Sequence, residues 1–521
     1  MNKHPYRLVL TVLILGYISD YLFWKQGIGI NFAIFAVLTL LAGFGLLYFS
    51  GDKPAKMSML LLIPFVFFAI MSFCRREPLT QFLTYTSCLF AIGILAVSYT
   101  GGQWIRYNLL DYIEKASLLV ASLVVRPVMY FVGLERQSKL ETEEMQQSKV
   151  PFAAIARGVL IALPILALFT WLLASADLVF QQKLIDLQDD DLFERFLLIL
   201  LVGYLLMGAF LHVATKSRDE KLIGLEKPIF APFLGFTESA IVMGSVTLLF
   251  LTFVGIQFQY FFGGYTEIGV DGYTYSEYAR RGFSELVIVV IINLLMIIGL
   301  SMITKRESNT QRKIFSGLSL AIVVQVVIML VSAFMRLSLA VDWHGFSRLR
   351  VYPQVFMIWL GILLVAIAVL EVYRRERYFT LAIVLTCLGF SATLSLMNVD
   401  ASIVHHNTQR TVAGKHFNVT HLANLSLDAL PALSEEFQVN EYSIAIHEGI
   451  GAAMVCYWHS EEYADALGTE WRSFNLSDWR AGQAIAANYK ALLEYKANID
   501  GSLIRVQGPS GIWYECSGED E

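Results

Sequence analysis

The chain has 521 residues, of which 56% are hydrophobic and only 16% are charged, and its mean hydropathy is +0.57. These values lie far outside the range of soluble globular proteins and exclude water as the main solvent of the fold. The formal net charge is only −5, so no basic excess points to nucleic acid, and we expect the lipid bilayer to be the main partner.

Eleven apolar runs follow one another along the sequence. A helix needs about 20 apolar residues to cross roughly 30 Å of hydrocarbon, where it satisfies its own backbone hydrogen bonds. We therefore predict an all-α polytopic membrane protein with about eleven transmembrane helices. The predicted spans are 8–24, 28–49, 57–74, 79–99, 159–176, 197–215, 236–257, 283–304, 314–335, 353–371 and 379–397. No small-residue cleavage site follows the first run, so we interpret it as a retained helix.

Lys and Arg residues fall mainly on alternate loops. The loops on the side of the N-terminus carry more than twice as many of these cations as the loops on the other side. Because cations are retained in the cytoplasm, we predict a cytoplasmic N-terminus and, after an odd number of crossings, an extracytoplasmic C-terminal part.

An apolar segment at 117–133 competes with this assignment. Arg126 and Pro127 lie at its middle. A further crossing here would invert the rest of the chain and weaken the cation bias. We therefore interpret this segment as an interfacial helix or a re-entrant segment on the cytoplasmic face.

The patterns divide the chain into four parts. Residues 1–102 are predicted to form a four-helix membrane group, 103–158 a cytoplasmic connector with the interfacial helix, and 159–398 a seven-helix membrane group. Charge returns in 399–521, which we interpret as an extracytoplasmic, mainly helical soluble domain of ordinary size. Within it, the stretch 502–516 is typical of strands and a turn.

Two further features of this C-terminal part bear on its structure. Ser477 and Asp478 are candidate caps of a helix. Cys456 and Cys516 are its only cysteines. An oxidising compartment would allow them to form a disulfide, and two buried free thiols are the alternative.

The strongest polar cluster is expected on the outer side, in 257–286. Glu277, Arg281 and Glu285 recur at a spacing of four, so they share one helix face, whereas Arg280 points elsewhere. Such a ladder could hold an anion or relay protons at the mouth of the helix bundle. The simpler interpretation, which we favour, is a structural clamp of ion pairs.

A second cluster follows in the next outer loop. It contains Arg336, Asp342, His344, Arg348 and Arg350. Three arginines at this place could bind an anionic partner such as a lipid phosphate. Such residues more often extend their charged ends to the headgroup region or form ion pairs with neighbouring acids.

Burial would be costly for six polar residues that we single out in the predicted spans, and we expect two of them, Asp20 and Glu238, to reach water from the span ends. The C-terminal part holds six of the nine histidines but no metal-binding spacing, so we predict neither a metal site nor a cofactor. The other four residues whose burial would be costly are Gln257, Gln325, Asn293 and His212.

Several segments together resemble an uncharacterised family of bacterial multi-pass membrane proteins labelled as a domain of unknown function. They are QFQYFFGG, TYSEYARRGFSEL, RLSLAVDWHGFSRLRVY, MNVDASIVHHNTQR and THLANLSLDALPAL, of which YARRGF and NLSLDALPAL are the most specific. The resemblance covers the chain from about residue 159 onward. It implies a location in the bacterial cytoplasmic membrane, no established activity and no catalytic residues.

The start of the C-terminal part has features of a docking segment. Asn398 and Asp400 follow the last predicted span, and Asn407 and Arg410 come shortly after. We expect these four residues to dock the soluble part onto the helix bundle, with Arg280 and Arg281 facing Asp400.

Three classes of function remain. We favour a non-enzymatic envelope protein that senses, scaffolds or assists a membrane or envelope protein partner, because the most distinctive residues cluster on the outer side. One alternative is a transporter or flippase that uses Arg281 and Arg336 to meet an anionic solute or lipid. Another is a membrane-embedded enzyme on envelope lipid or glycan, with Glu277 or Glu285 as the acid–base residue, although no motif nominates a nucleophile.

Overall fold

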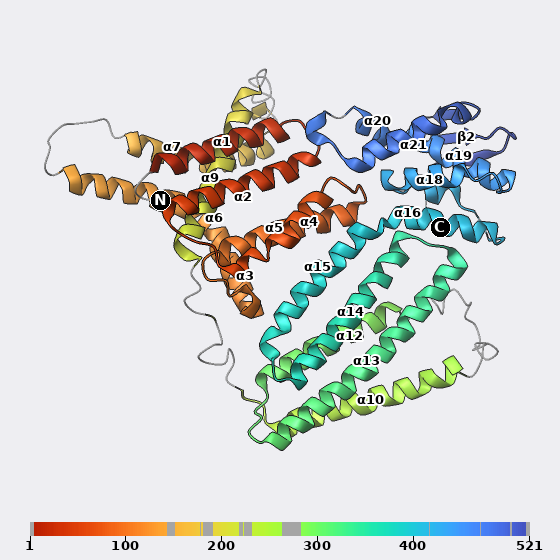
Figure 1. Ribbon diagram of the computed structural model, residues 1–521, viewed down its shortest axis with the longest axis horizontal. Coiled ribbons are helices and arrows are strands. Elements are labelled where there is room, and N and C mark those ends of the chain that lie inside the picture. Colours follow the sequence, from red (N-terminus) through yellow and green to blue (C-terminus); the bar gives the residue numbers. More distant parts are fainter. Residues whose placement is uncertain are drawn as a thin grey trace.

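Figure 1 shows the computed structural model of the chain, a large assembly of helices with a small sheet near the C-terminus. The structure describes residues 5–142, 152–177, 179–180, 191–217, 222, 232–262, 283–415, 417–468, 470–500 and 503–516. The helices of the first half are α1 (Pro5–Phe23), α2 (Ile30–Ser50), α3 (Lys56–Met59), α4 (Leu62–Met71), α5 (Pro78–Ser98), α6 (Leu109–Thr142), α7 (Phe152–Ala176) and α9 (Leu192–Lys216). Those that follow are α10 (Phe236–Phe262), α12 (Phe283–Ile303), α13 (Asn309–His344), α14 (Arg348–Val372) and α15 (Phe379–Met397).

Ten helices of the described residues are long and apolar enough to cross a membrane, and nine of them coincide with predicted spans. The all-α polytopic membrane architecture is therefore confirmed. The predicted span 57–74 is divided between the short helices α3 and α4, and 159–176 lies within α7. The tenth helix is α6, which contains the segment 117–133.

The ends of these helices follow from local sequence signals. Ser308 and Gln311 form a reciprocal capping box at the start of α13. Gly51, with a φ of 83°, ends α2 in the left-handed conformation that glycine adopts without strain. These signals fix where the long apolar helices begin and end.

The helices α1, α2, α4, α5, α6, α7 and α9 form one group. Glycines allow α1 and α9 to approach closely: a Cβ on Gly16 would lie 2.4 Å from the carbonyl oxygen of Ile199, and one on Gly203 would lie 3.1 Å from that of Val12. Small residues commonly permit such backbone contacts between membrane helices. α9 also packs against α5 and α6, and α7 packs against α6 and α9.

The helices α10, α12, α13, α14 and α15 share a second hydrophobic core. α15 also contacts α4 and α5 and so joins the two groups. The predicted division after residue 102, with a seven-helix group over 159–398, differs from this packing, because α7 and α9 lie with the N-terminal helices. Hydropathy identifies spans but carries no information on which spans pack together.

The residues after α15 form a unit that we call the tail. Its helices are α16 (Val399–Val412), α17 (Val419–Ala423), α18 (Leu430–Phe437), α19 (Ile444–Trp458), α20 (Glu461–Leu467) and α21 (Leu476–Leu492). An antiparallel sheet follows, in which Lys496 lies opposite Gln507 and Arg505 opposite Glu515. Its strands are β1 (Lys496–Asp500), β2 (Leu503–Gln507) and β3 (Trp513–Glu515), so the strand character predicted for 502–516 is confirmed.

The hydrophobic core of the tail continues into the helix bundle. Val351 and Val355 of α14 and Leu394 of α15 belong to the same buried cluster as the residues of α16 to α21. The chain turns at Asn398, whose φ of 49° ends α15 and whose side chain caps α16. The tail is therefore packed directly onto helix ends, without an intervening linker.

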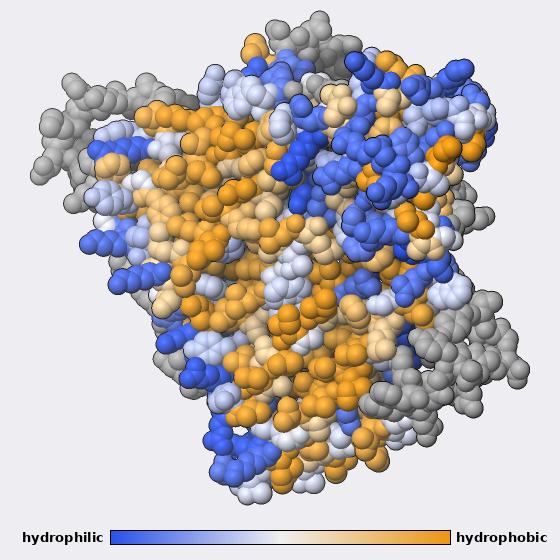
Figure 2. Space-filling view, turned by 45° about the vertical axis from the view of Figure 1, so that its right-hand side comes forward, coloured by the Kyte–Doolittle hydropathy of each residue, from blue (hydrophilic) through white to orange (hydrophobic). Residues whose placement is uncertain are grey.

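The bundle has two faces, which we name from the tail. The tail face carries the α1–α2, α4–α5 and α13–α14 turns and the end of α15, which border the tail on its left and lower side in Figure 1. The opposite face carries the start of α1, the ends of α5 and α9, and the α14–α15 turn. Figure 2 shows hydrophobic surface over the long helices and mainly hydrophilic surface over the tail.

α6 crosses the helices of the first group toward their ends on the opposite face. Its Leu119 belongs to a cluster with Ile94 near the end of α5, and its Phe131 packs with Leu8 near the start of α1. In Figure 1, α6 accordingly runs across α2 and not along it. By length and composition α6 would also suit a crossing. The interfacial position of 117–133 stays a prediction, which these contacts favour.

Candidate functional site at the junction of the tail and the bundle

The predicted outer ladder is described only at its end. Glu277, Arg280 and Arg281 lie outside the described residues. Glu285 begins the described side chains of α12 and is exposed. The structure therefore neither assembles nor separates this ladder.

The second predicted cluster lies mostly on helices. α13 extends to His344 and α14 begins at Arg348, so the expected outer loop is reduced to a short turn at 345–347. Arg336 is half-buried on α13, and Asp342, further along this helix, is exposed. Arg350 donates to the carbonyl oxygen of Gly345 at 2.9 Å and so closes the turn.

Arg348 forms the best-shielded ion pair of this region with Asp400 of the tail. Its Nε and Nη2 donate to the two carboxylate oxygens at 2.8 and 2.5 Å. Asp400 is fully buried and also accepts from the amide and the hydroxyl of Ser426, at 2.8 and 2.6 Å. The partner of Asp400 is therefore Arg348 of α14, while Arg280 and Arg281, which we expected to face it, lie outside the described residues.

The other three predicted docking residues also lie at this junction. The Asn407 side chain accepts from the amide of Phe346 and donates to its carbonyl oxygen, both at 2.8 Å. Arg410 donates to the carbonyl oxygens of Asp342 and Trp343 at the end of α13. Asn398 donates to the carbonyl oxygen of Asp428 at 3.3 Å. α16 thus holds the α13–α14 turn through hydrogen bonds from one side of the helix.

Sequence reasoning missed a second set of contacts, around the α4–α5 turn. Arg76 donates from Nε and Nη2 to the two carboxylate oxygens of Asp478, at 2.8 and 2.6 Å. The backbone amides of Arg76 and Glu77 both donate to Asp428, at 2.7 and 2.8 Å. The tail therefore binds both the side chain and the backbone of the α4–α5 turn.

Glu77 completes this set from within the bundle. It is 3% exposed and caps α5 by accepting from the amides of Leu79 and Thr80 at 2.9 and 2.7 Å. The hydroxyls of Thr80 and Tyr352 also donate to its carboxylate. Its negative charge lies at the positive end of the helix dipole, where it is stabilised.

Two pKa shifts follow from this geometry. The hydrogen bonds to Asp478 raise the pKa of the Arg76 guanidinium. Burial raises the pKa of the Asp428 carboxyl, and the hydrogen bonds from the amides of Arg76 and Glu77 oppose part of that rise. The junction therefore contains one carboxyl group that resists ionisation next to pairs that favour it.

The cap of α21 differs from the predicted one. Asn475 is the N-cap, and its side chain accepts from the amide of Ser477 at 2.8 Å. Asp478, which we considered as a cap, instead binds Arg76. The cap lies two residues before Ser477 and three before Asp478, and only the tertiary fold reveals the distant arginine.

The two acids expected to reach water from the span ends differ in their surroundings. Asp20 is 1% exposed and binds Arg195 of α9 at 2.7 Å, so it does not reach water as predicted. Glu238 is exposed, as predicted, and accepts from the amide of Gly235 at 2.6 Å. On the opposite face, Glu371 is 2% exposed and binds Arg306 at 2.6 Å.

Of the two alternatives for the tail cysteines, the structure contains the disulfide between Cys456 and Cys516. It joins α19 to the residue that follows β3.

Among the described residues, no group of three or more His, Cys, Asp or Glu side chains is arranged to hold a metal ion.

A polar cavity of about 480 Å³ adjoins the junction. It is bordered by Lys25 of the α1–α2 turn, by Arg76, and by Glu462, Asp465 and Glu470 of the tail.

The buried carboxylates of the junction accept hydrogen bonds from arginines, amides and hydroxyls, so none of them is positioned as an acid–base group. The arrangement is suited to fixing the tail on the bundle.

Local signals existed for some of the missed residues. Glu77 precedes Pro78, and Pro is favoured in the first turn of a helix, so this pair marks an N-terminus whose cap is acidic. Ser426 two residues before Asp428 marks a second turn. No local signal connects Arg76 with Asp478.

Comparison with known proteins gives a family but no activity. No curated protein and no solved structure matches the chain. The family model described as a domain of unknown function, DUF4153, matches residues 62–436, which extend from α4 into α18 and include most of the junction. The match begins earlier than the resemblance at about residue 159 suggested, and the chain belongs to the DUF4153 family.

Proposed function

We propose that this integral membrane protein is a non-enzymatic scaffold of the bacterial cytoplasmic membrane, whose tail binds a membrane or envelope protein partner on the outer side. The observation that carries the proposal is the junction, in which Arg348–Asp400 and Arg76–Asp478 fix the tail to helices from both groups of the bundle. A change in the tail would therefore be transmitted to both groups, as a sensor or an accessory subunit requires.

The orientation rests on two independent features. The opposite face receives the cation-rich loops, which are retained in the cytoplasm. The tail contains the disulfide between Cys456 and Cys516, which persists in an oxidising compartment. Both features support a cytoplasmic N-terminus and an extracytoplasmic tail.

The partner is expected on the outward face of α21. Trp479 and Tyr489 of α21 and Leu493, its C-cap, are 54%, 47% and 57% exposed, and helical spacing places them on one side of the helix. Arg480 and Lys490 flank them. Large aromatic residues beside basic ones are typical of interface centres, where Trp, Tyr and Arg carry most of the binding energy.

The orientation can be tested by cysteine labelling. In a chain whose three free cysteines Cys74, Cys88 and Cys387 are replaced, Glu461→Cys in the tail should react with a membrane-impermeant maleimide in intact cells. The matched variant Lys313→Cys, at the start of α13 near the opposite face, should react only after the cells are permeabilised. The reverse pattern would overturn the orientation.

The partner can be tested by photo-crosslinking. A photoreactive amino acid at Trp479 should give a specific adduct with another protein in native membranes, and the same amino acid at Asn498 of β1 should not. Arg76→Met should weaken the Trp479 adduct, because it loosens the tail. Absence of any protein adduct at Trp479 would contradict the scaffold function.

A further inference from the structure

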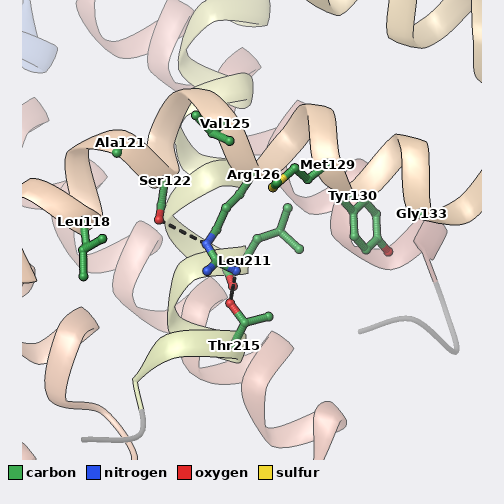
Figure 3. Close-up of a pocket in the computed structure, with 10 residues that line it drawn as sticks. All are labelled: Leu118, Ala121, Ser122, Val125, Arg126, Met129, Tyr130, Gly133, Leu211 and Thr215. Atoms are coloured by element: carbon green, nitrogen blue, oxygen red, sulfur yellow. Dashed lines mark hydrogen bonds between the residues drawn. The ribbon is translucent and has the colours of Figure 1, made fainter. Parts of the chain in front are cut away.

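A groove on the opposite face combines one arginine with an apolar lining. It lies where α6 crosses the last turns of α9 and has a volume of about 440 Å³. We call it the α6–α9 groove; its principal residues are Leu118, Arg126 and Met129 of α6 and Leu211 and Thr215 of α9. Figure 3 shows the Arg126 side chain extending from α6 toward Leu211 and Thr215.

The polar part of the groove is a chain of neutral donors and acceptors around this cation. Arg126 donates from Nε to the hydroxyl of Ser122 at 3.1 Å and from Nη1 to the hydroxyl of Thr215. The buried His212 lies behind them, with Nδ1 2.7 Å from the Ser122 hydroxyl. Among the described residues, no carboxylate forms an ion pair with Arg126. Its guanidinium has five N–H donors, so several remain available to an anion.

The apolar part of the groove is open to the surroundings. Leu118, Val125 and Met129 are 47%, 48% and 67% exposed along one side of α6. A cation held among exposed alkyl side chains matches a ligand with a negative head and hydrocarbon chains better than a freely soluble anion.

The depth of the groove matches that of lipid headgroups. Thr215 lies in the last turn of α9, two residues before Ser217, whose carbonyl oxygen accepts from the amide of Gly101 in the loop after α5. Tyr130, further along α6, packs in a cluster with Leu8, next to Arg7 in the first turns of α1. Arg126 therefore lies where the spanning helices leave the hydrocarbon.

The groove depends on a close crossing of α6 and α9. A Cβ on Gly208 would lie 2.4 Å from the carbonyl oxygen of Leu123 and 2.5 Å from its Cα. Glycine at this position therefore lets the two backbones touch, and the contact holds Arg126 over the last turn of α9. The nearest atoms that a larger residue would meet all belong to the Leu123 backbone, and backbone atoms cannot move aside as the end of a flexible side chain could.

From these observations we infer that the α6–α9 groove binds an anionic phospholipid, with the lipid phosphate on Arg126 and an acyl chain along Leu118 and Met129. An anionic lipid supplies the counter-charge that the described residues do not, whereas a zwitterionic headgroup brings a cation of its own. Arg is suited to the task because its planar fork presents two parallel N–H groups to phosphate oxygens. The site is independent of the scaffold function proposed for the tail.

The test is native mass spectrometry of the full chain, released from detergent micelles and titrated with phosphatidylglycerol or phosphatidylcholine. Wild type should retain one phosphatidylglycerol more tightly than phosphatidylcholine. Arg126→Gln should weaken that retention by about tenfold or more, because a hydrogen-bonded charge is lost. Arg126→Lys should restore part of it, since the charge returns without the fork.

The matched control is Arg106→Gln, which removes another exposed arginine beside the opposite face and should leave the tightly bound lipid in place. Equal loss in both variants would show non-specific attraction and overturn the site. Inorganic phosphate should not displace the lipid, and displacement at millimolar concentration would assign the groove to a soluble anion.

A second variant covers the case in which Arg126→Gln does not fold. Met129→Glu keeps Arg126 and places a negative charge at the exposed mouth of the groove, so it should expel the anionic lipid. Retention of phosphatidylglycerol by folded Met129→Glu would overturn the inference.

Discussion

Arg76 and Asp478 are 402 positions apart in the sequence, and the guanidinium of one donates two parallel hydrogen bonds, of 2.8 and 2.6 Å, to the carboxylate of the other. The pair joins the α4–α5 turn to the start of α21. Shielded pairs of this kind contribute little net stability compared with well-packed apolar residues, but breaking one leaves an uncompensated charge. Its main effect is therefore to specify how the tail sits on the bundle.

Replacing Arg76 alone should destabilise the tail. In Arg76→Met, the Asp478 side chain, only 5% exposed, loses its counter-charge. We expect a loss in the free energy of unfolding at the lower end of the about 3–5 kcal/mol typical of broken buried pairs, because Arg76 retains some contact with solvent. Denaturant titration in detergent, followed by tryptophan fluorescence, measures the change.

The neighbouring Arg480 provides the control for this experiment, because it lies on α21 with an exposed side chain. Arg480→Met should change the stability little. The double variant Arg76→Met with Asp478→Leu should recover most of the loss, because it removes the charge left behind. If Arg76→Met and Arg480→Met were equally stable, the pair would not hold the tail.

Asp400 should be as sensitive on the other side of the junction. Asp400→Asn removes the charge that faces Arg348 and replaces an acceptor of the Ser426 hydrogen bonds by an amide that also donates. We expect about 3 kcal/mol of destabilisation and faster cleavage of the tail by trypsin. Limited proteolysis followed on gels measures this release.

Asp342→Asn is the matched control, because Asp342 is exposed and contacts the tail through its backbone carbonyl oxygen. Its rate of cleavage should equal that of wild type. A protected tail in Asp400→Asn would remove the docking role of this residue.

The membrane architecture was largely readable from the sequence, and the packing was not. Spans such as 236–257 follow from the energy of burying apolar residues in lipid, which is a local property of the chain. Whether α9 packs with α1 or with α10 depends on the shapes of both surfaces, for example on Gly16 meeting the backbone at Ile199. Hydropathy contains no such information.

The candidate site was readable only in part for a related reason. The docking role of Asn407 and Arg410 follows from their position just after the last span, and both contact the α13–α14 turn. The partner of Asp400 depended on which of several loop arginines folds next to it, and tertiary packing decides that. In the sequence Arg76 is only one of the loop cations, because nothing near it marks Asp478 as its partner.

The disulfide should contribute to the stability of the tail. Cys456 and Cys516 are separated by 60 residues, and closing a loop of this length is worth about 4 kcal/mol in the chain-entropy model. Cys516→Ser, or reduction of the wild type, should therefore lower the Tm of the tail. Cys74→Ser is the control, since Cys74 is a free thiol. A Tm unaffected by reductant, with the bond shown to be broken, would contradict this expectation.

Asp428 should give the junction a distinctive dependence on pH. Burial raises the pKa of this carboxyl above its ordinary value of 3.8, so the folded protein holds the proton more tightly than the unfolded chain. Between these two pKa values, lowering the pH favours the folded state, and this contribution is lost as the pH rises through the raised pKa. Asp428→Asn cannot titrate and lacks the effect.

The comparison to make is the free energy of unfolding of wild type minus that of Asp428→Asn, measured by denaturant titration from neutral pH down to about pH 4, near the ordinary pKa of the Asp carboxyl. The difference should shift in favour of wild type as the pH falls, by up to about 1.4 kcal/mol per pH unit. Asp465→Asn, which makes the same charge change at an exposed site of α20, should show a nearly constant difference. A constant difference for Asp428→Asn as well, or a shift toward the variant at low pH, would mean that Asp428 is ionised in the junction and that its hydrogen bonds outweigh the cost of its burial.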